Sequence, residues 1–180
     1  EVSAERYQIQ RYREGAHSII YRATDLQTGR ILGIKKHLHY IPDTDDPEEI
    51  RLAEERFARE VDVLAKLDHP GIMKAHGFFF TQEEGVPRPH LVMELIDQDS
   101  LEDRLKKGQA FNEADAREIV LSVGTVLDYM HTVNGRPIIY RDLKPDNVKV
   151  MPFDGAWPNK IVDFSESRIG LLAEVIIGWS

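Results

Sequence analysis

The chain has 180 residues, of which 42% are hydrophobic and 30% charged, a composition typical of a soluble globular protein with one sizeable core or two small lobes. Its net charge of −8 argues against a general nucleic-acid-binding protein, because such proteins need basic patches to meet phosphates. The sequence has no cysteine for a disulfide or thiolate metal site and no segment long enough to span a membrane, so we expect a cytoplasmic protein.

The first half of the sequence predicts an antiparallel sheet with one helix. Gly15 and the turn Gln27-Thr28-Gly29 separate the early β-prone stretches. Apolar residues then recur every three or four positions from Glu48 to Leu67, which predicts a helix that ends at His69-Pro70-Gly71. A loop is expected over 81–87. The expected strands are 7–9, 19–23, 31–35, 72–80 and 90–95.

The second half of the sequence predicts helices. Ser100 is a candidate cap for a short helix over 101–107, with Asp103 as its capping-box partner. Asn112 precedes a longer helix. Its expected buried face comprises Ala116, Ile119, Val123, Leu127 and Met130. The change from strands to helices places a boundary near 97–100.

Residues 140–147 read Tyr-Arg-Asp-Leu-Lys-Pro-Asp-Asn and carry the strongest chemical signal. Phosphoryl transfer needs a carboxylate to orient the acceptor hydroxyl and oxygen ligands for a metal ion. Asp142 and Asn147 have the five-residue spacing of the protein-kinase catalytic loop, and Lys144 lies between them. The chain therefore resembles a eukaryotic-type protein kinase, in the style of the bacterial serine/threonine kinases.

This resemblance implies roles for further residues. Leu32-Gly33-Ile34-Lys35 is similar to the V-A-I-K strand, so Lys35 rather than Lys36 would clamp the α- and β-phosphates, and Glu60 would pair with Lys35. Ile161-Val162-Asp163-Phe164-Ser165 resembles the strand leading into D-F-G. The implied site residues are Asp142 and Lys144 for catalysis, Asn147 and Asp163 for Mg²⁺, and Gly15, Lys35, Glu60, Met93, Glu94 and Ile96 for ATP. Backbone groups of Glu94 and Ile96 would bond the adenine, and Met93 would lie behind it.

The resemblance also implies an α+β, two-lobed fold. Residues 1–96 would form an antiparallel-sheet N-lobe with one helix and the hinge, and residues 97–180 a shortened helical C-lobe. Three features depart from the family pattern. Arg13, Gly15 and Ser18 stand where the phosphate-covering loop usually has three glycines, which predicts a stiffer loop. Tyr140 replaces a histidine and is expected to pack under Phe164, and Ser165 replaces the glycine of D-F-G.

No A-P-E segment follows Arg168. The apolar stretch 169–180 is open to three interpretations: a cover for a shortened lobe, the point where a longer protein was cut, or a surface for self-association or a partner. The leading hypothesis is a serine/threonine kinase that acts on protein substrates with ATP and Mg²⁺. The alternative is a pseudokinase-like or minimal kinase-like scaffold that binds nucleotide without phosphotransfer. A small-molecule kinase with the same fold is less favoured, because the run from Leu143 to Asn147 resembles that of protein kinases.

Overall fold

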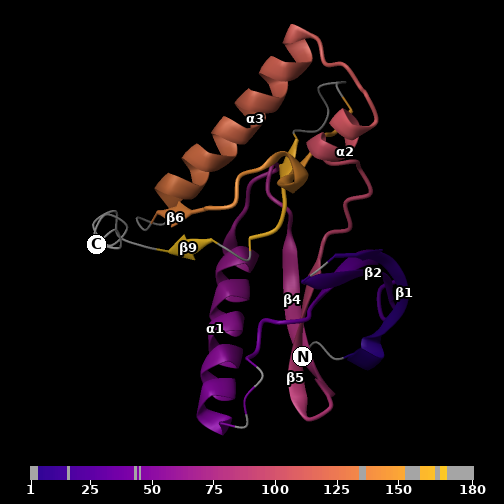
Figure 1. The fold of residues 1–180 in the computed structure, drawn as a ribbon, viewed down its shortest axis with the longest axis vertical. Coiled ribbons are helices and arrows are strands. Elements are labelled where there is room, and N and C mark those ends of the chain that lie inside the picture. Colours follow the sequence, from indigo (N-terminus) through magenta and orange to yellow (C-terminus); the bar gives the residue numbers. More distant parts are fainter. Residues whose placement is uncertain are drawn as a thin grey trace. The chain divides into compact units, whose positions relative to one another are not determined.

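The structure is a computed structural model that describes residues 4–15, 17–42, 44, 46–133, 137–152, 159–164 and 167–169. The chain divides into two compact units (Figure 1). The first comprises Glu1–Asp68 and Lys74–Ile96, and the second comprises His69–Met73 and Asp97–Ser180. The chain changes units at Ile96 and Asp97, where the sequence placed the boundary. In addition, the short segment 69–73 belongs to the second unit.

The first unit contains a five-stranded antiparallel sheet with the order β1-β2-β3-β5-β4. Its strands are β1 (Tyr7–Glu14), β2 (Ser18–Asp25), β3 (Ile31–His37), β4 (Ala75–Glu83) and β5 (Val86–Met93), and a 3₁₀ turn (Ala4–Arg6) precedes them. The prediction of a loop over 81–87 is wrong, because β4 and β5 continue on either side of a tight turn at Glu84 and Gly85. Pro87 and Pro89 are tolerated in β5 because that part of the strand pairs with β4 alone.

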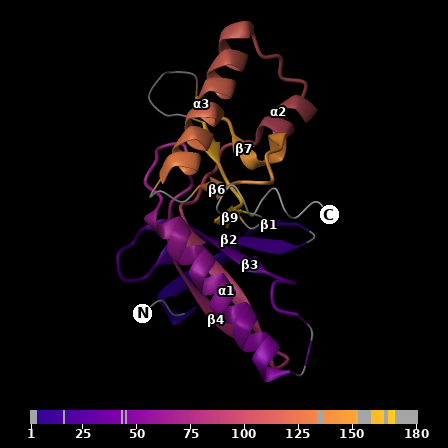
Figure 2. The same ribbon diagram turned by 90° about the vertical axis from the view of Figure 1, so that its left-hand side faces the viewer.

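Helix α1 (Pro47–Lys66) covers one face of this sheet (Figure 2). The Phe57 ring makes edge contacts with rings of His37 on β3 and of Phe78 and Phe80 on β4. The opposite face carries a separate core. It consists of Tyr7, Ala23, Leu32, Ile34, Phe79 and Val92. Because side chains alternate along a strand, the two cores assign the positions of β3, which pairs without a register shift, to one face or the other.

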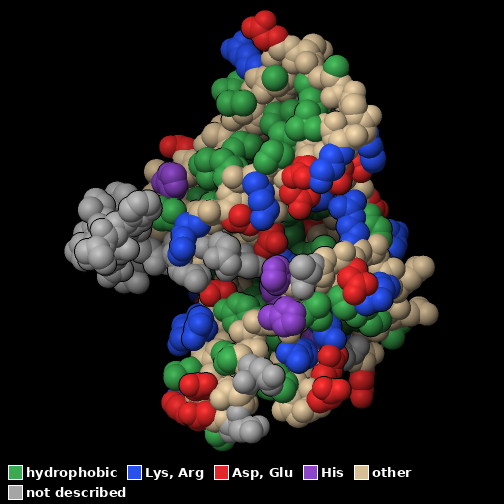
Figure 3. Space-filling view, viewed as in Figure 1, with side chains coloured by type: hydrophobic (Ala, Val, Ile, Leu, Met, Phe, Trp, Pro, Cys, Tyr) green, Lys and Arg blue, Asp and Glu red, His purple; other side chains and the backbone are tan. Residues whose placement is uncertain are grey.

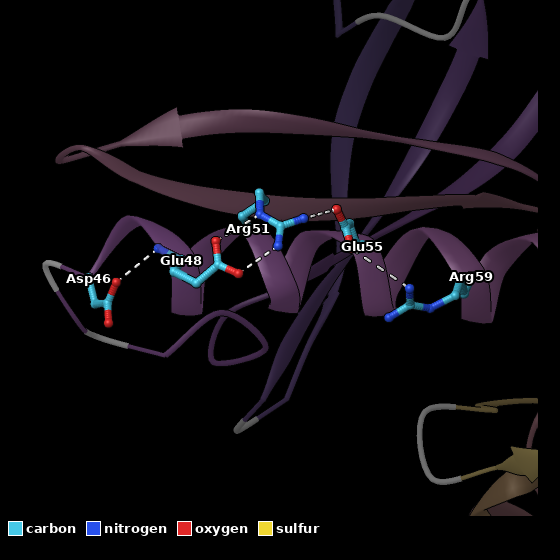
Figure 4. A network of polar contacts seen from close by, with 5 residues as sticks. All are labelled: Asp46, Glu48, Arg51, Glu55 and Arg59. Atoms are coloured by element: carbon cyan, nitrogen blue, oxygen red, sulfur yellow. Dashed lines mark hydrogen bonds and ion pairs between the residues drawn. The ribbon is translucent and has the colours of Figure 1, made fainter.

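The amino-terminal half of α1 is stabilised by its own charges (Figure 4). Asp46 caps the helix by accepting a hydrogen bond from the Glu48 amide at 2.9 Å. The Arg51 guanidinium lies between Glu48 and Glu55 and bonds both, and Glu55 continues to Arg59 at 3.8 Å. Exposed pairs of this spacing each contribute a few tenths of a kcal/mol, about 0.2–0.5, to a helix. The network therefore fixes α1 up to the residue before Glu60.

A buried carboxylate holds the turn between β2 and β3. Asp25, 2% exposed, accepts two hydrogen bonds from the Arg6 guanidinium, at 2.9 and 2.5 Å. It also accepts from the Thr28 hydroxyl at 2.8 Å and from the Gln27 amide at 3.0 Å. The bonds from Arg6, more than the others, keep the pKa of Asp25 well below its ordinary value of 3.8. The carboxylate thus joins the turn to the start of the chain.

Within its described residues, the second unit holds two α-helices and two pairs of short strands. Both helices begin with capping boxes, Ser100 with Asp103 as expected, and Asn112 with Asp115. The elements are α2 (Leu101–Lys106), α3 (Glu113–Thr132), β6 (Ile138–Ile139), a 3₁₀ turn (Pro145–Asn147), β7 (Val148–Lys149), β8 (Lys160–Ile161) and β9 (Arg168–Ile169). Strand β6 pairs with β9, and β7 pairs with β8, both antiparallel. In addition, Ile72 forms a parallel bridge with Ile161.

The buried face of α3 is displaced from the predicted one. Ile119 and Met130 are buried as expected, but Ala116 is exposed and Val126, 0% exposed, is the most deeply buried together with Met130. Val120, also on α3, is 69% exposed. Figure 3 shows that hydrophobic side chains gather on the surface of the second unit. Within the described residues, α3 and every other helix is too short or too polar to cross a membrane.

Candidate active site

The loop 140–147 brings three of the predicted site residues into direct contact. Lys144 Nζ donates a hydrogen bond to Asp142 Oδ2 at 2.8 Å. Asn147 Nδ2 donates to the same oxygen at 2.8 Å and to the Asp142 backbone carbonyl at 2.9 Å. Both side-chain contacts use Oδ2, and among the described residues no hydrogen bond to Oδ1 is found, so Oδ1 is the oxygen that we expect to face a hydroxyl group. The carboxylate is oriented before any substrate binds.

The local chain conformation explains this contact. Lys144 is extended, as a residue before proline prefers, and Pro145 starts a 3₁₀ turn that brings Asn147 back towards Asp142. Arg141, directly before Asp142, has a left-handed φ of 70°. A non-glycine residue in that region costs of the order of 1–3 kcal/mol, and such residues cluster at functional sites.

Asp163 lies beside this loop through the β7–β8 pairing. The Val162 amide donates to the Asn147 carbonyl at 3.0 Å, which places the next residue, Asp163, close to Asn147. Asp163 itself has a left-handed φ of 59°. The pKa of Lys144 is raised, chiefly by its hydrogen bond to Asp142, and the charge of Asp163 adds to the rise. Asp142, Lys144, Asn147 and Asp163 thus form one group in the second unit.

Tyr140 packs under Phe164 as the sequence predicted, with ring centroids 5.2 Å apart and the planes at 69°. Its hydroxyl also donates a hydrogen bond to the Val162 carbonyl, a contact that the sequence did not predict. Burial raises the pKa of Tyr140, and the nearby charges of Asp163 and Asp142 raise it further. The phenol is therefore a neutral donor that fixes the backbone on the amino-terminal side of Asp163.

In the first unit, strand alternation separates the two candidate lysines. Lys36 bonds Glu83 and lies on the sheet face opposite α1, with Ile34. Lys35 lies on the same face as His37, whose ring contacts Phe57 of α1. It is 8% exposed and lies on the side of the sheet that α1 covers. Lys35 and Lys36 therefore lie on opposite faces of the sheet, and the phosphate-binding role expected for Lys35 stays a prediction.

Glu60 is half-buried on α1, one turn after Phe57, so it belongs to the same helix as the residues that pack on the sheet. Its pairing with Lys35 stays a prediction.

The residues expected at the adenine lie at the end of β5 and directly after it. The Glu94 amide donates to the Lys74 carbonyl at 2.8 Å, so an adenine can meet the backbone of Glu94 only through its carbonyl oxygen. Met93 ends β5 opposite Gly33 of β3. A Cβ atom on Gly33 would lie 3.3 Å from two Met93 side-chain carbons, so an alanine at this position would require the Met93 side chain to shift by a few tenths of an ångström. Ile96 is half-buried at the last position of this unit.

Gly15 lies in the β1–β2 hairpin, where its amide donates to the Ser18 carbonyl at 2.9 Å. A Cβ atom there would have Ser18 O as its nearest neighbour, at 3.8 Å, an ordinary contact. The protein's own atoms therefore do not require glycine at this position. The Arg13 guanidinium lies 5.5 Å from the Tyr12 ring centroid. Ser165 and the apolar stretch from 170 lie outside the described residues.

The donor set suits ATP with Mg²⁺. Mg²⁺ prefers carboxylate and amide oxygens, and usually takes one or two carboxylates from the protein together with phosphates from the substrate. Asp163 and Asn147 match this set. In the part of the chain that the structure describes, no three His, Cys, Asp or Glu residues cluster for a metal held by the protein alone. A metal shared with a nucleotide is the type that fits.

A five-stranded sheet with one helix, followed by a helical unit that carries an oriented Asp-Lys-Asn loop, is the arrangement expected of a protein kinase domain. Residues 9–170 match the protein kinase domain family, and the chain belongs to that family. It is an α+β protein kinase domain, and membership of the family implies the use of ATP.

Known relatives are similar over most of this chain. Myosin light chain kinase A of Dictyostelium discoideum is 32% identical over 155 residues, which cover 86% of this chain and 48% of that protein. Calcium/calmodulin-dependent protein kinase type IV of Mus musculus is 34% identical over 155 residues, covering 86% of this chain and 29% of that protein. The chain spans about half or less of the length of these relatives. Both are eukaryotic, and a special likeness to bacterial kinases stays a prediction.

Proposed function

We propose that the chain transfers the γ-phosphoryl group of ATP, with Mg²⁺, to a serine or threonine hydroxyl of a protein substrate. The observation that carries this proposal is the Asp142 carboxylate, which Lys144 and Asn147 both hold through Oδ2. Asn147 is joined in turn to the backbone next to Asp163. Four residues to which we assign roles in phosphoryl transfer, Asp142, Lys144, Asn147 and Asp163, thus lie in one unit.

Each residue of this group has a distinct task. Asp142 orients the acceptor hydroxyl and takes its proton through Oδ1, while the Lys144 ammonium stabilises the charge on the transferring phosphoryl group. Asn147 and Asp163 hold Mg²⁺, which neutralises the phosphate oxygens when bound. In the first unit, Lys35 holds the α- and β-phosphates.

Two features support serine and threonine as the acceptors. Lys144 stands directly after Leu143, which resembles the catalytic loop of serine/threonine kinases rather than that of tyrosine kinases. One relative of the chain, 28% identical over 155 residues, is named serine/threonine-protein kinase tousled-like 2 in Homo sapiens.

The test is transfer of labelled phosphate from ATP to a generic protein substrate by the full-length protein. Asp142→Asn removes the proton acceptor and is expected to lower the rate about 10²–10⁴-fold. Asp146→Asn is the matched control, because Asp146 lies in the same loop but bonds the Ser100 hydroxyl at 3.2 Å. Equal transfer by the wild-type protein and Asp142→Asn would refute the proposal.

A second candidate function is nucleotide binding without phosphotransfer, as a regulatory scaffold. It is favoured by Arg13 and Ser18 in the hairpin where the family usually has glycines, since their side chains hinder close approach of the backbone to phosphate. In this case Mg-ATP would raise the melting temperature of the wild-type protein and of Asp142→Asn equally, and neither would transfer phosphate.

A further inference from the structure

The segment 69–73 forms a strand-like contact beside β8, the strand that leads to Asp163. The Ile161 amide donates to the Gly71 carbonyl at 2.8 Å, and the Met73 amide donates to the Ile161 carbonyl at 3.1 Å. On its other side, Ile161 pairs with β7. Ile161 is therefore held between two neighbouring backbones.

The backbone contacts continue from Ile161 towards the metal-binding position. Val162 is bonded through its amide to Asn147 and through its carbonyl to the Tyr140 hydroxyl. Asp163 follows directly in a left-handed conformation. A displacement of Ile161 would thus be transmitted over two residues to the Asp163 carboxylate.

Gly71 lies directly against Val126 of α3. A Cβ atom on Gly71 would be 2.5 Å from Val126 Cγ2, 3.2 Å from the Asn159 carbonyl oxygen and 3.3 Å from His69 Nδ1. Favourable contacts between carbon atoms are about 3.5–4.0 Å, so an added methyl group would push the segment or α3 away by about 1 Å. Gly71 does not have a left-handed φ, so lack of space, not backbone conformation, excludes a side chain.

The neighbours of Gly71 have little freedom to move. Val126 and Asn159 are 0% and 2% exposed. The Asn159 side chain is bonded to the Met151 amide at 3.0 Å and to the Ser122 hydroxyl at 3.3 Å. His69 accepts a hydrogen bond from the Gly71 amide at 3.0 Å. The 69–73 segment, bonded mainly through its backbone, is the part that would shift.

We propose that Gly71 is a positioning residue for Asp163, because its lack of a side chain lets the 69–73 segment lie against α3 and pair with Ile161. The metal-binding role of Asp163 rests on the proposed function, whereas the positioning itself does not. A misplacement of about 1 Å can cost about 100-fold in catalysis. Gly71→Ala is therefore expected to weaken the Mg²⁺-dependent part of nucleotide binding and to lower phosphotransfer by up to that factor.

The experiment compares Gly71→Ala with the double variant Gly71→Ala/Val126→Ala, which removes the methyl group nearest to the added one. Val126→Ala alone is the reference for the double variant. Gly124→Ala is the matched control, because Gly124 lies on α3 with Val126 and a Cβ atom on Gly124 would meet nothing within 4 Å. The readouts are the backbone amide signals of Val162 and Asp163 by nuclear magnetic resonance, and the affinity for a fluorescent ATP analogue with and without Mg²⁺.

Gly71→Ala is expected to move both amide signals and to reduce the Mg²⁺-dependent gain in affinity. The double variant is expected to restore the amide signals and the gain in affinity, and Gly124→Ala is expected to leave both unchanged. Unchanged amide signals in Gly71→Ala, or a double variant no better than Gly71→Ala, would overturn the proposal. If Gly71→Ala does not fold, the double variant decides: recovery of the fold and the signals supports the proposal, and failure refutes it. If the wild-type protein binds no Mg-nucleotide, the proposed function fails, while the amide signals still test the positioning role.

Discussion

The Tyr140 hydroxyl offers a direct test of how the backbone before Asp163 is held. Tyr140 is 2% exposed, and its hydroxyl donates to the Val162 carbonyl. Tyr140→Phe keeps the ring and its contact with Phe164 but leaves a carbonyl without this donor. An unsatisfied buried group costs about 1–3 kcal/mol. For a protein of this size 1 kcal/mol corresponds to about 2–4 °C, so the melting temperature should fall by about 2–12 °C.

The assay is thermal unfolding and urea unfolding, both followed by circular dichroism, combined with hydrogen exchange of the Ile161 amide. Tyr21→Phe serves as the control, since no hydrogen bond to its hydroxyl is found within the described residues and its ring is only partly buried; it should change stability by less than about 0.5 kcal/mol. If Tyr140→Phe unfolds at the same urea concentration as the control, and Ile161 exchanges at the wild-type rate, the hydroxyl does not hold the strand and the reasoning is wrong.

Three other variants test separate parts of the structure. Lys35→Ala should reduce kcat/KM for phosphotransfer by about 10²-fold or more, whereas Lys36→Ala on the opposite sheet face should stay near wild type; the reverse order would contradict the face assignment. Arg6 lowers the pKa of Asp25, so the Asp25 carboxylate stabilises the protein above its ordinary pKa of 3.8, and this stabilisation is lost as the pH falls further. In Asp25→Asn the urea midpoint should be lower at neutral pH, and it should fall less than that of the wild-type protein when the solution is acidified. Gly15→Ala should leave the free energy of unfolding within about 0.5 kcal/mol of wild type and weaken ATP binding in an equilibrium titration. A large loss of stability instead would show that the hairpin itself requires glycine.

The elements of the fold were largely predictable because their signals are local. The apolar period of α1 and the alternation of β2 and β3 each arise within a few residues, and the structure has these elements close to the expected bounds. Strand β1 begins at Tyr7 as expected but continues to Glu14 instead of ending at residue 9. The strand expected over 90–95 exists, but β5 already begins at Val86, a start that the prediction missed because Pro87 and Pro89 are ordinarily read as breakers. Strand order decides whether a proline is tolerated, and strand order is a property of the whole sheet.

The site separates in the same way into local and distant parts. Asp142, Lys144 and Asn147 are near one another in the chain, so their spacing predicts their contact, and the structure has it. Asp163 is sixteen residues beyond Asn147, and only the resemblance to kinases connected them before the β7–β8 pairing was seen. The choice of Lys35 over Lys36 likewise came from the family motif. The sheet supplies the physical reason, because neighbouring residues of β3 face opposite sides.

The contacts of the 69–73 segment could not be predicted, and the reason is physical. They are hydrogen bonds between backbone groups, which every residue except proline can form, so they impose no pattern of side chains along the sequence. Such a contact affects the sequence only where two backbones or a backbone and a helix come too close for a side chain. Gly71 is such a place, with Val126 at 2.5 Å from its Cβ position. In the sequence this glycine, after His69 and Pro70, indicated only the end of a helix. Its second constraint becomes visible only when α3, more than fifty residues later, is placed against it. Substitution at Gly71 therefore separates the two interpretations: a residue that merely ends α1 would tolerate alanine, whereas one packed on Val126 would not.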